Sequence, residues 1–195
     1  SPEQIGTLTG SVQRSSTSSD RQVGALVGEG GKILRLVRSD RGGAPTCVAV
    51  GSIASERPTS LGVSSNGAVA VGTSSGRLFV FLPGETEPRT KLFHDVVGEA
   101  ASIGSVCWEE PEDVCVVVPS DGHVVRWDVR NGRELGSILV AWPDSRVAEF
   151  AASEGALYLG GGDFTLRKFS REGEELSAKR LGDRSIVAIR YVGRD

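Results

Sequence analysis

The sequence of 195 residues has no methionine, only two histidines, only three cysteines and 6% aromatic residues. Two histidines are too few for a His-based metal centre. Three irregularly spaced cysteines make neither a disulfide framework nor a zinc site. Free cysteines are typical of a reducing compartment, so we expect a cytoplasmic or other intracellular setting. We therefore predict no catalytic, metal-binding or cofactor-binding residue set, and no enzyme.

Long apolar runs and strong positive charge are also missing. No run approaches the roughly 20 apolar residues that span a bilayer, so we expect no membrane insertion. A net charge of −3 and a pI of about 5.5 give no basic field for nucleic acid. Because the chain begins at Ser1 without a visible signal peptide, we expect it to be a piece of a longer protein.

Glycine, in contrast, is abundant, with 26 residues that have no triplet period, and this indicates many turns. Four segments share one pattern of an apolar run, a Gly/Ser/Asp turn and an alternating strand. They are GALVGEGGKILRLV (24–37), GAVAVGTSSGRLFVF (67–81), DVCVVVPSDGHVVRWD (113–128) and GALYLGGGDFTLRKF (155–169). No segment of ten or more residues has helical periodicity, so the chain is predicted to be nearly all β.

The spacing of the repeat predicts the fold. The large apolar residues that end the four units are separated by 45, 46 and 42 residues; they are Leu36, Phe81, Trp127 and Phe169. A period of that size is typical of the four-stranded blade of a β-propeller. Each unit also has a strand before it, such as 59–63, and a weaker one after it, such as 46–52. In the first unit the leading strand is undefined, and 14–21 is predicted to be a flexible loop.

We therefore predict a single all-β propeller domain, or part of one, over 1–195, with about four four-stranded blades. The blades are expected at approximately 1–52, 53–95, 96–142 and 143–182, and 183–195 is expected to begin a further blade. In that last segment, 185–193 is predicted to be a first strand. Four blades and a fragment favour part of a larger ring; a four-bladed ring and a half-propeller completed by a second chain remain alternatives.

The third unit resembles the WD40 repeat family. The likeness lies in Asp121-Gly122 at the turn, in Trp127-Asp128 at the strand end, and in His94, which is separated from Trp127 by 32 intervening residues. In that family a His, an Asp and a strand Ser or Thr are tied to the Trp. The resemblance thus implies a structural role for His94, Asp121 and Trp127, rather than a catalytic one. Phe93 replaces the usual Gly, Val117 lies near the Ser/Thr position, and the other units lack the Trp-Asp pair.

Two segments, DGHVVRWDVRNGRELGS and GALYLGGGDFTLRKFSREGEEL, are also similar to the blades of quinoprotein-like propellers. This second resemblance implies a small ligand or cofactor at the central channel. A ligand site there needs converging charged groups, whereas we expect apolar residues on the inner strands: Leu61, Val63, Val106, Val147 and Ile186. We therefore predict no cofactor, and a quinoprotein-like or lectin-like ligand-binding propeller remains the alternative.

Other motifs are interpreted as structure. The glycine clusters at 28–31 and 160–164 precede strands, whereas a phosphate-binding loop needs a following helix. Cys107 and Cys115 flank a turn and are predicted to face each other across a hairpin as buried thiols, with a strained redox pair as the alternative. Trp108 is assigned to the core, and Trp142 to either core or surface.

The function of a propeller usually lies on loops gathered at one face. The expected second turns and blade-connecting loops share such a face, and we predict partner-binding residues there: Glu29, Asp95, Glu99, Asp121, Asp144, Arg146, Asp163, Asp183 and Arg184. Because acids predominate, a basic peptide is the natural partner. The function predicted is a non-catalytic scaffold whose partners are other proteins or the rest of its own parent chain.

Overall fold

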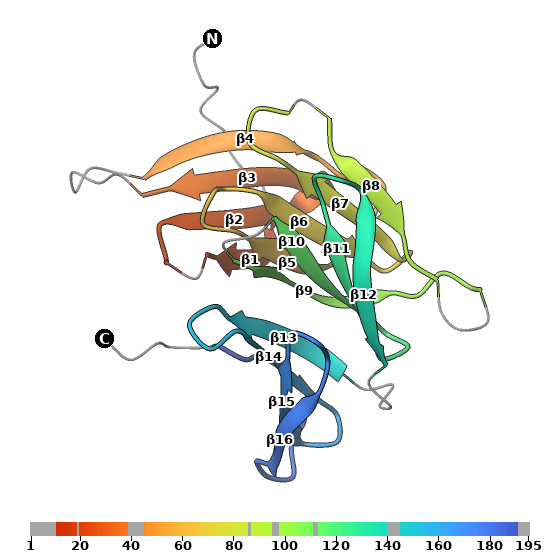
Figure 1. Cartoon of the computed structure of the whole chain (residues 1–195). Helices are drawn as coiled ribbons and strands as arrows, with labels where there is room; N and C mark the ends of the chain where they lie inside the picture. The colour runs from red at the N-terminus through yellow and green to blue at the C-terminus, as the bar shows by residue number, and fades with distance from the viewer. Residues whose placement is uncertain are drawn as a thin grey trace.

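A computed structural model of the chain describes residues 11–18, 20–38, 45–85, 87–94, 98–110, 113–139 and 145–190. Apart from one short 3-10 turn, Glu29–Gly31, the regular structure in these ranges is β. The strands form four separate antiparallel sheets of four strands each, and within each sheet the strands follow one another in sequence order (Figure 1). This arrangement confirms the all-β prediction and the four-stranded unit.

Each sheet is one blade, and consecutive strands within it are hydrogen-bonded neighbours. Blade 1 contains β1 (Val12–Thr17), β2 (Val23–Gly28), β3 (Lys32–Val37) and β4 (Thr46–Ser52). Blade 2 contains β5 (Pro58–Val63), β6 (Val69–Thr73), β7 (Arg77–Phe81) and β8 (Arg89–Leu92). Blade 3 contains β9 (Ile103–Glu109), β10 (Val114–Pro119), β11 (His123–Asp128) and β12 (Arg133–Leu139). Blade 4 contains β13 (Ser145–Ala151), β14 (Ala156–Gly161), β15 (Thr165–Ser170) and β16 (Glu175–Arg180).

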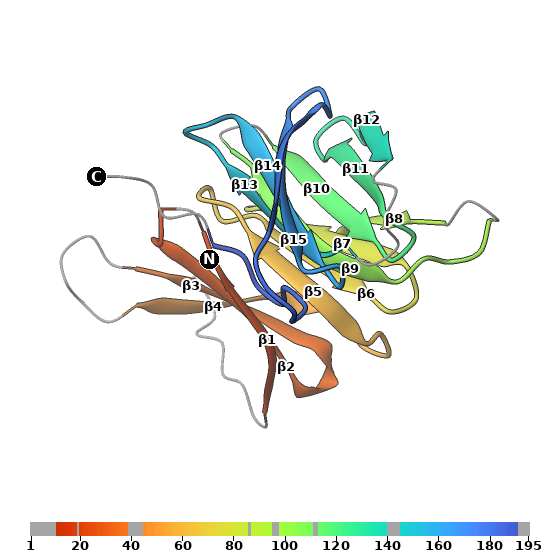
Figure 2. The same ribbon diagram turned by 90° about the horizontal axis from the view of Figure 1, so that it is seen from below.

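The first strand of each blade lies innermost. β1 contacts β5, β5 contacts β9, and β9 contacts β13, so the four blades are arranged around a common axis (Figure 2). Because side chains alternate between the two faces of a strand, each blade presents one face to the preceding blade and the other to the next. The core therefore lies between blades.

Three apolar clusters fill the spaces between successive blades. Between blades 1 and 2, Val27 and Ile33 are buried with Val69, Val71 and Phe81. The clusters between blades 2 and 3 and between blades 3 and 4 have the same character. Every residue of β6 and of β10 is buried, since both faces of these strands are covered. This explains why their sequences are almost continuously apolar instead of alternating.

A buried charge lies at the interface between blades 3 and 4. Glu109, whose side chain is 1% exposed, accepts two hydrogen bonds of 2.7 Å from the guanidinium of Arg126. Nε of Arg171, from blade 4, lies 2.6 Å from Oε1 of Glu109. A buried carboxylate is tolerated when charged donors surround it in this way.

Two predictions about strands were wrong. Residues 14–21 were expected to be a loop, yet Val12–Thr17 forms β1, which pairs with β2. An inner strand faces the axis, so hydroxyl and charged residues suit it although they give no apolar pattern. Residues 185–193 were expected to be a strand, but the described part, 185–190, has no strand assignment. Among the described residues, no strand forms a ladder of hydrogen bonds with this segment.

We expect the substitution Phe81→Ala to destabilise the protein strongly. The Phe81 ring is 5% exposed in the cluster between blades 1 and 2, and it lies against Gly51 of β4. Loss of a buried ring should lower the free energy of unfolding by about 3–5 kcal/mol. Urea denaturation followed by circular dichroism measures this, with Leu92→Ala, at a 42% exposed leucine, as the control. Equal losses for the two variants would contradict a core between blades.

Candidate functional site

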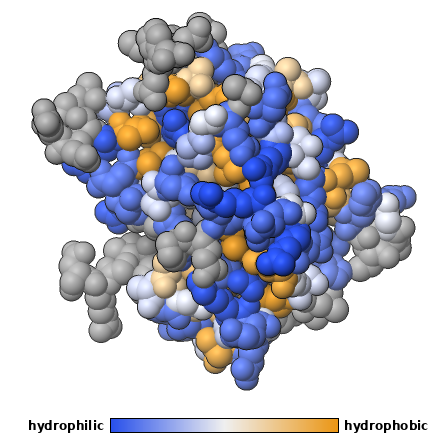
Figure 3. Space-filling view, turned by 45° about the horizontal axis from the view of Figure 1, so that its top comes forward, coloured by the Kyte–Doolittle hydropathy of each residue, from blue (hydrophilic) through white to orange (hydrophobic). Residues whose placement is uncertain are grey.

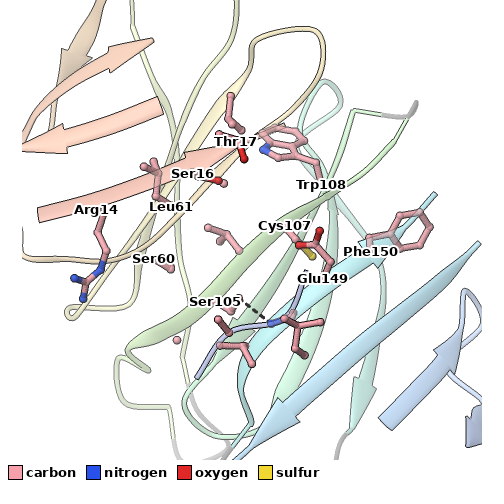
Figure 4. A pocket seen from close by; sticks show the side chains of 18 of the residues that line it. Arg14, Ser16, Thr17, Ser60, Leu61, Ser105, Cys107, Trp108, Glu149 and Phe150 are labelled. Atoms are coloured by element: carbon pink, nitrogen blue, oxygen red, sulfur yellow. Dashed lines mark hydrogen bonds between the residues drawn. The ribbon is translucent and has the colours of Figure 1, made fainter. Parts of the chain in front are cut away.

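An axial pocket of about 460 Å³ lies between the inner strands of the four blades. Residues of β1, β5, β9 and β13 line it together with Val187, Ala188 and Ile189 (Figure 4). The inner strands of the four blades thus form a cavity on their common axis. A propeller that binds a small ligand would hold the ligand in such a cavity.

The lining of this pocket is more polar than the sequence indicated. The inner strands were expected to present apolar residues, and Leu61, Val106 and Val147 do line the pocket. Hydroxyl groups and charges accompany them, in the side chains of Arg14, Ser15, Ser16, Thr17, Thr59, Ser60, Ser105 and Glu149. The apolar residues were thus predicted at the pocket, but the polar ones between them were not, because the sequence pattern of short strands does not show which face turns inward.

Several side-chain hydrogen bonds around the pocket join one blade to the next. Nε of Arg14 in β1 donates to the carbonyl oxygen of Thr59 in β5, at 3.0 Å. The hydroxyl of Thr59 donates to the carbonyl oxygen of Ile103 in β9, at 2.6 Å. The N–H of Ala148 in β13 donates to the hydroxyl of Ser105 in β9, at 3.0 Å. These contacts connect neighbouring inner strands that belong to different sheets.

The two cysteines of blade 3 do not face each other. Cys115 pairs with Trp108, and Cys107 pairs with Val116, so the two thiols lie on opposite faces of the sheet. Each packs in a different apolar cluster as a buried free thiol, which confirms the apolar interpretation and removes the hairpin disulfide. Burial raises the pKa of both thiols, and for Cys107 the carboxylate of Glu149 raises it further. Figure 4 shows Glu149 beside Cys107 at the pocket.

The second candidate surface is the rim, defined here as the face formed by the β2–β3, β6–β7, β10–β11 and β14–β15 turns and the loops that connect blades. Backbone hydrogen bonds tie these two sets of loops together. Phe93 N–H donates to Gly76 O at 2.9 Å, and Ile53 N–H donates to Gly31 O at 3.0 Å. Likewise Leu181 N–H donates to Phe164 O at 2.9 Å. The turns within the blades and the loops between blades thus share one face, as expected when the strands of each sheet follow one another in sequence order.

A groove of about 370 Å³ opens on the rim between blades 2 and 3. Phe93, which is buried, and Pro119 give it an apolar part. Around them lie side chains of both charges, which are Lys91, His94, Asp121, His123 and Glu134. Lys91 and Glu134 form a hydrogen-bonded ion pair across the two blades. An apolar floor with charged walls is suited to holding a peptide side chain.

The expected link between His94, Asp121 and Trp127 is not present. Asp121 accepts the backbone N–H of His123 at 3.0 Å, and its other oxygen lies 2.9 Å from Nδ1 of His123. His94 is exposed and forms a backbone bridge with Ala100. Trp127 is buried between blades 2 and 3, and its indole N–H has no partner among the described residues. An Asp at a turn bonds first to the N–H two residues ahead, and this local contact prevails.

The rim acids divide into two groups. Asp121 and Asp163 stabilise their turns: Asp163 accepts the N–H of Thr165 at 3.2 Å and pairs with Arg167 at 2.6 Å. The acids Glu29, Glu99 and Asp183 are exposed, and so is the base Arg184. Asp95, Asp144 and Trp142 lie outside the described residues, as does the side chain of Arg146. Some of the predicted rim acids thus stabilise their own turns, whereas others are exposed.

Sequence reasoning missed the residues that join the blades. Glu109 is the first residue of the acidic stretch EEPED, which was interpreted as a turn, so the sequence gave no signal of its buried pairing. Thr59 and Ser105 gave no signal, because hydroxyl residues are common in strands and their partners are far away in sequence. Within the described ranges, no three His, Cys, Asp or Glu side chains are grouped to hold a metal ion. In the same ranges no helix is long and apolar enough to cross a membrane.

We expect alkylation to separate Cys47 from the other two cysteines. Cys47 is half-buried, whereas Cys107 and Cys115 are buried with raised pKa values, so little thiolate forms on them near pH 8. Iodoacetamide should therefore label Cys47 first, and the other two only after urea is added. Peptide mass spectrometry measures the three rates. Labelling of Cys107 in the folded protein as fast as that of Cys47 would contradict the buried position.

No protein-family model matches this sequence, and no curated protein matches it. Solved structures do. The chain is similar to the crystal structure of the RRP9 WD40 repeats, with a TM-score of 0.66 and 14% identity over 88% of this chain and 52% of that one. It is also similar to the computationally designed Ika8 protein, with a TM-score of 0.69 and 17% identity over 93% of this chain and 53% of that one.

The chain thus spans about half the length of the structures it matches. At such low identity the likeness concerns the fold alone. It confirms the resemblance to WD40 repeats at that level: the chain folds as successive blades of a WD40-like β-propeller.

Proposed function

We propose that this chain is a non-catalytic interaction scaffold that binds partner proteins at its rim. The proposal rests mainly on one observation, the rim groove between blades 2 and 3. There a buried aromatic ring, Phe93, is surrounded by side chains of both charges. Grooves of this composition recognise a peptide through one anchored side chain and a few placed polar contacts.

The exposed acids of the rim support a basic partner. Glu29, Glu99 and Asp183 are exposed and come from the loops of three different parts of the arc. A peptide rich in Lys or Arg would gain favourable long-range attraction from them, which increases its association rate. An intracellular setting fits the three free cysteines and is part of the same proposal.

The hydroxyls of the axial pocket support a structural role for that cavity, not a catalytic one. Thr59, Ser60 and Ser105 bond to backbone groups, and a serine nucleophile needs an adjacent general base. Both histidines lie at the rim groove instead. The rival proposal is a small ligand in the axial pocket, favoured by its polar lining with Arg14 and Glu149.

A peptide library displayed on phage and panned against the protein tests the scaffold. We expect enriched peptides rich in Lys and Arg, whose affinity falls at least about tenfold for the variant Glu134→Lys, which reverses a charge of the groove. The matched control is Glu174→Lys, which changes the net charge equally at an exposed residue of the opposite face. Equal weakening by both variants would reduce the effect to net charge and refute an acidic rim site.

Native mass spectrometry of the purified protein tests the rival. A scaffold should show the mass of the polypeptide alone, whereas a small molecule that leaves with the Glu149→Gln variant would establish the axial ligand site. If such a molecule is found and no peptide is enriched, the scaffold proposal is refuted and the axial ligand site is supported.

A further inference from the structure

A lysine of the protein itself occupies the acidic side of the rim groove. Lys91 lies in β8, and its Nζ donates a hydrogen bond of 2.5 Å to Oε1 of Glu134 in β12. The same ammonium group lies over the ring of Phe93, 5.4 Å from its centre, where a cation and an aromatic ring attract each other. Glu134 and Phe93 thus hold a cation between blades 2 and 3, and that cation belongs to the same chain.

The contact between Lys91 and Glu134 is of a kind that contributes little stability. The Glu134 side chain is 50% exposed and that of Lys91 is 23% exposed, and ion pairs in such contact with water are weak. Arg89, two residues earlier in β8, differs, because its guanidinium donates to the backbone oxygens of Val129 and Arg130 in blade 3. Arg89 therefore connects the two blades, whereas Lys91 can leave its acid at low cost.

Of the two acids that line the groove, Glu134 is the one that can accept a partner. The Asp121 side chain is 10% exposed, and its two oxygens contact the backbone N–H and the ring of His123. Among the described residues, Oε2 of Glu134 has no hydrogen-bond or ion-pair partner. A guanidinium can donate to both oxygens of a carboxylate, whereas an ammonium is a point charge. An arginine would therefore gain a contact at Glu134 that Lys91 does not make.

We propose that an arginine side chain of a partner peptide displaces Lys91 from Glu134 and Phe93, so that Lys91 is a competitor within the protein that lowers the affinity of the groove. This inference rests on the proposed function, since it names the partner residue that the rim groove receives. Lys91 has a flexible stem and turns toward water, and the guanidinium then stacks on the ring that Lys91 covered. The groove selects arginine over lysine, because a lysine would only replace one ammonium by another.

Blade 4 contains a matched arrangement outside the groove. Nζ of Lys168 lies 2.6 Å from Oε2 of Glu154 and 5.6 Å from the centre of the Tyr158 ring. The Lys168 side chain is 29% exposed, close to the 23% of Lys91. Substitution of Lys168 therefore removes the same charge and the same kinds of contact, but at a place that does not line the groove.

The probe is the tripeptide acetyl-Ala-Arg-Ala-amide, added to the isotope-labelled chain and followed by NMR, which measures weak binding. We expect shifts of the amides of 91–94 and 134–137. The dissociation constant should be at least about threefold lower for Lys91→Gln than for the parent protein, because the competing cation is gone. Lys168→Gln, the matched control, should bind within about 1.5-fold of the parent. Acetyl-Ala-Lys-Ala-amide should bind the parent at least about threefold more weakly than the arginine peptide.

The variant Lys91→Arg separates competition from charge. It keeps the positive charge, but its guanidinium can bond to both oxygens of Glu134, so it is a stronger competitor. We expect it to bind the arginine peptide at least about threefold more weakly than the parent, whereas simple repulsion by a cation at position 91 would leave the affinity unchanged. Circular dichroism and thermal melts show that the variants are folded.

Three results would overturn the proposal: equal affinity of Lys91→Gln and the parent, equal affinity of Lys91→Arg and Lys91→Gln, or no shift in the groove of Lys91→Gln. The rim scaffold and the role of Lys91 can fail separately. Panning that enriches basic peptides dependent on Glu134, together with no gain for Lys91→Gln, would leave the scaffold standing and refute the competitor. If panning enriches no peptide and the tripeptide causes no shift in the groove, both are refuted.

Discussion

Burial of sheet faces between neighbouring blades is the interaction on which the rest of this structure depends. A single four-stranded sheet has too little apolar area to be stable alone. Here the faces of blades 1 to 4 meet in three apolar clusters, and β6 and β10 are buried on both sides. The positions of all loops follow from this stacking, because every blade is oriented by its neighbour. The apolar faces therefore provide the stability, and they also fix where the loops lie.

Polar groups at these interfaces obey the same constraint. In the described part of the chain no backbone ladder joins the sheets to one another, and side chains connect them. Thr59 and Ser105 supply hydroxyls across two blade boundaries, and Glu109 is held by arginines of blades 3 and 4. A buried polar atom without a partner would cost about 1–3 kcal/mol, so each of these contacts also limits how neighbouring blades can shift.

The surface reflects this division of roles. Figure 3 shows one side of the molecule, on which hydrophilic residues predominate and apolar patches are small and scattered. Exposed large apolar residues occur singly on several blades, for example Val12, Leu92 and Leu176. Scattered apolar residues need no partner. The rim groove between blades 2 and 3, where apolar and charged side chains lie together, differs from this scattered pattern.

The sequence by itself determined the repeat, since the spacing from Leu36 to Phe169 and the turn glycines depend only on local chemistry. Gly67, Gly76 and Gly122 indeed adopt the positive φ that those turns require. The buried thiols were likewise predictable from residue type. Tertiary structure alone decided that Val12–Thr17 is a strand and that 185–190 is not, because strand formation requires a neighbour. It also gathered hydroxyls at the axis. These outcomes depend on contacts between residues far apart in sequence or on which face of a strand turns inward, and neither is written in a local pattern.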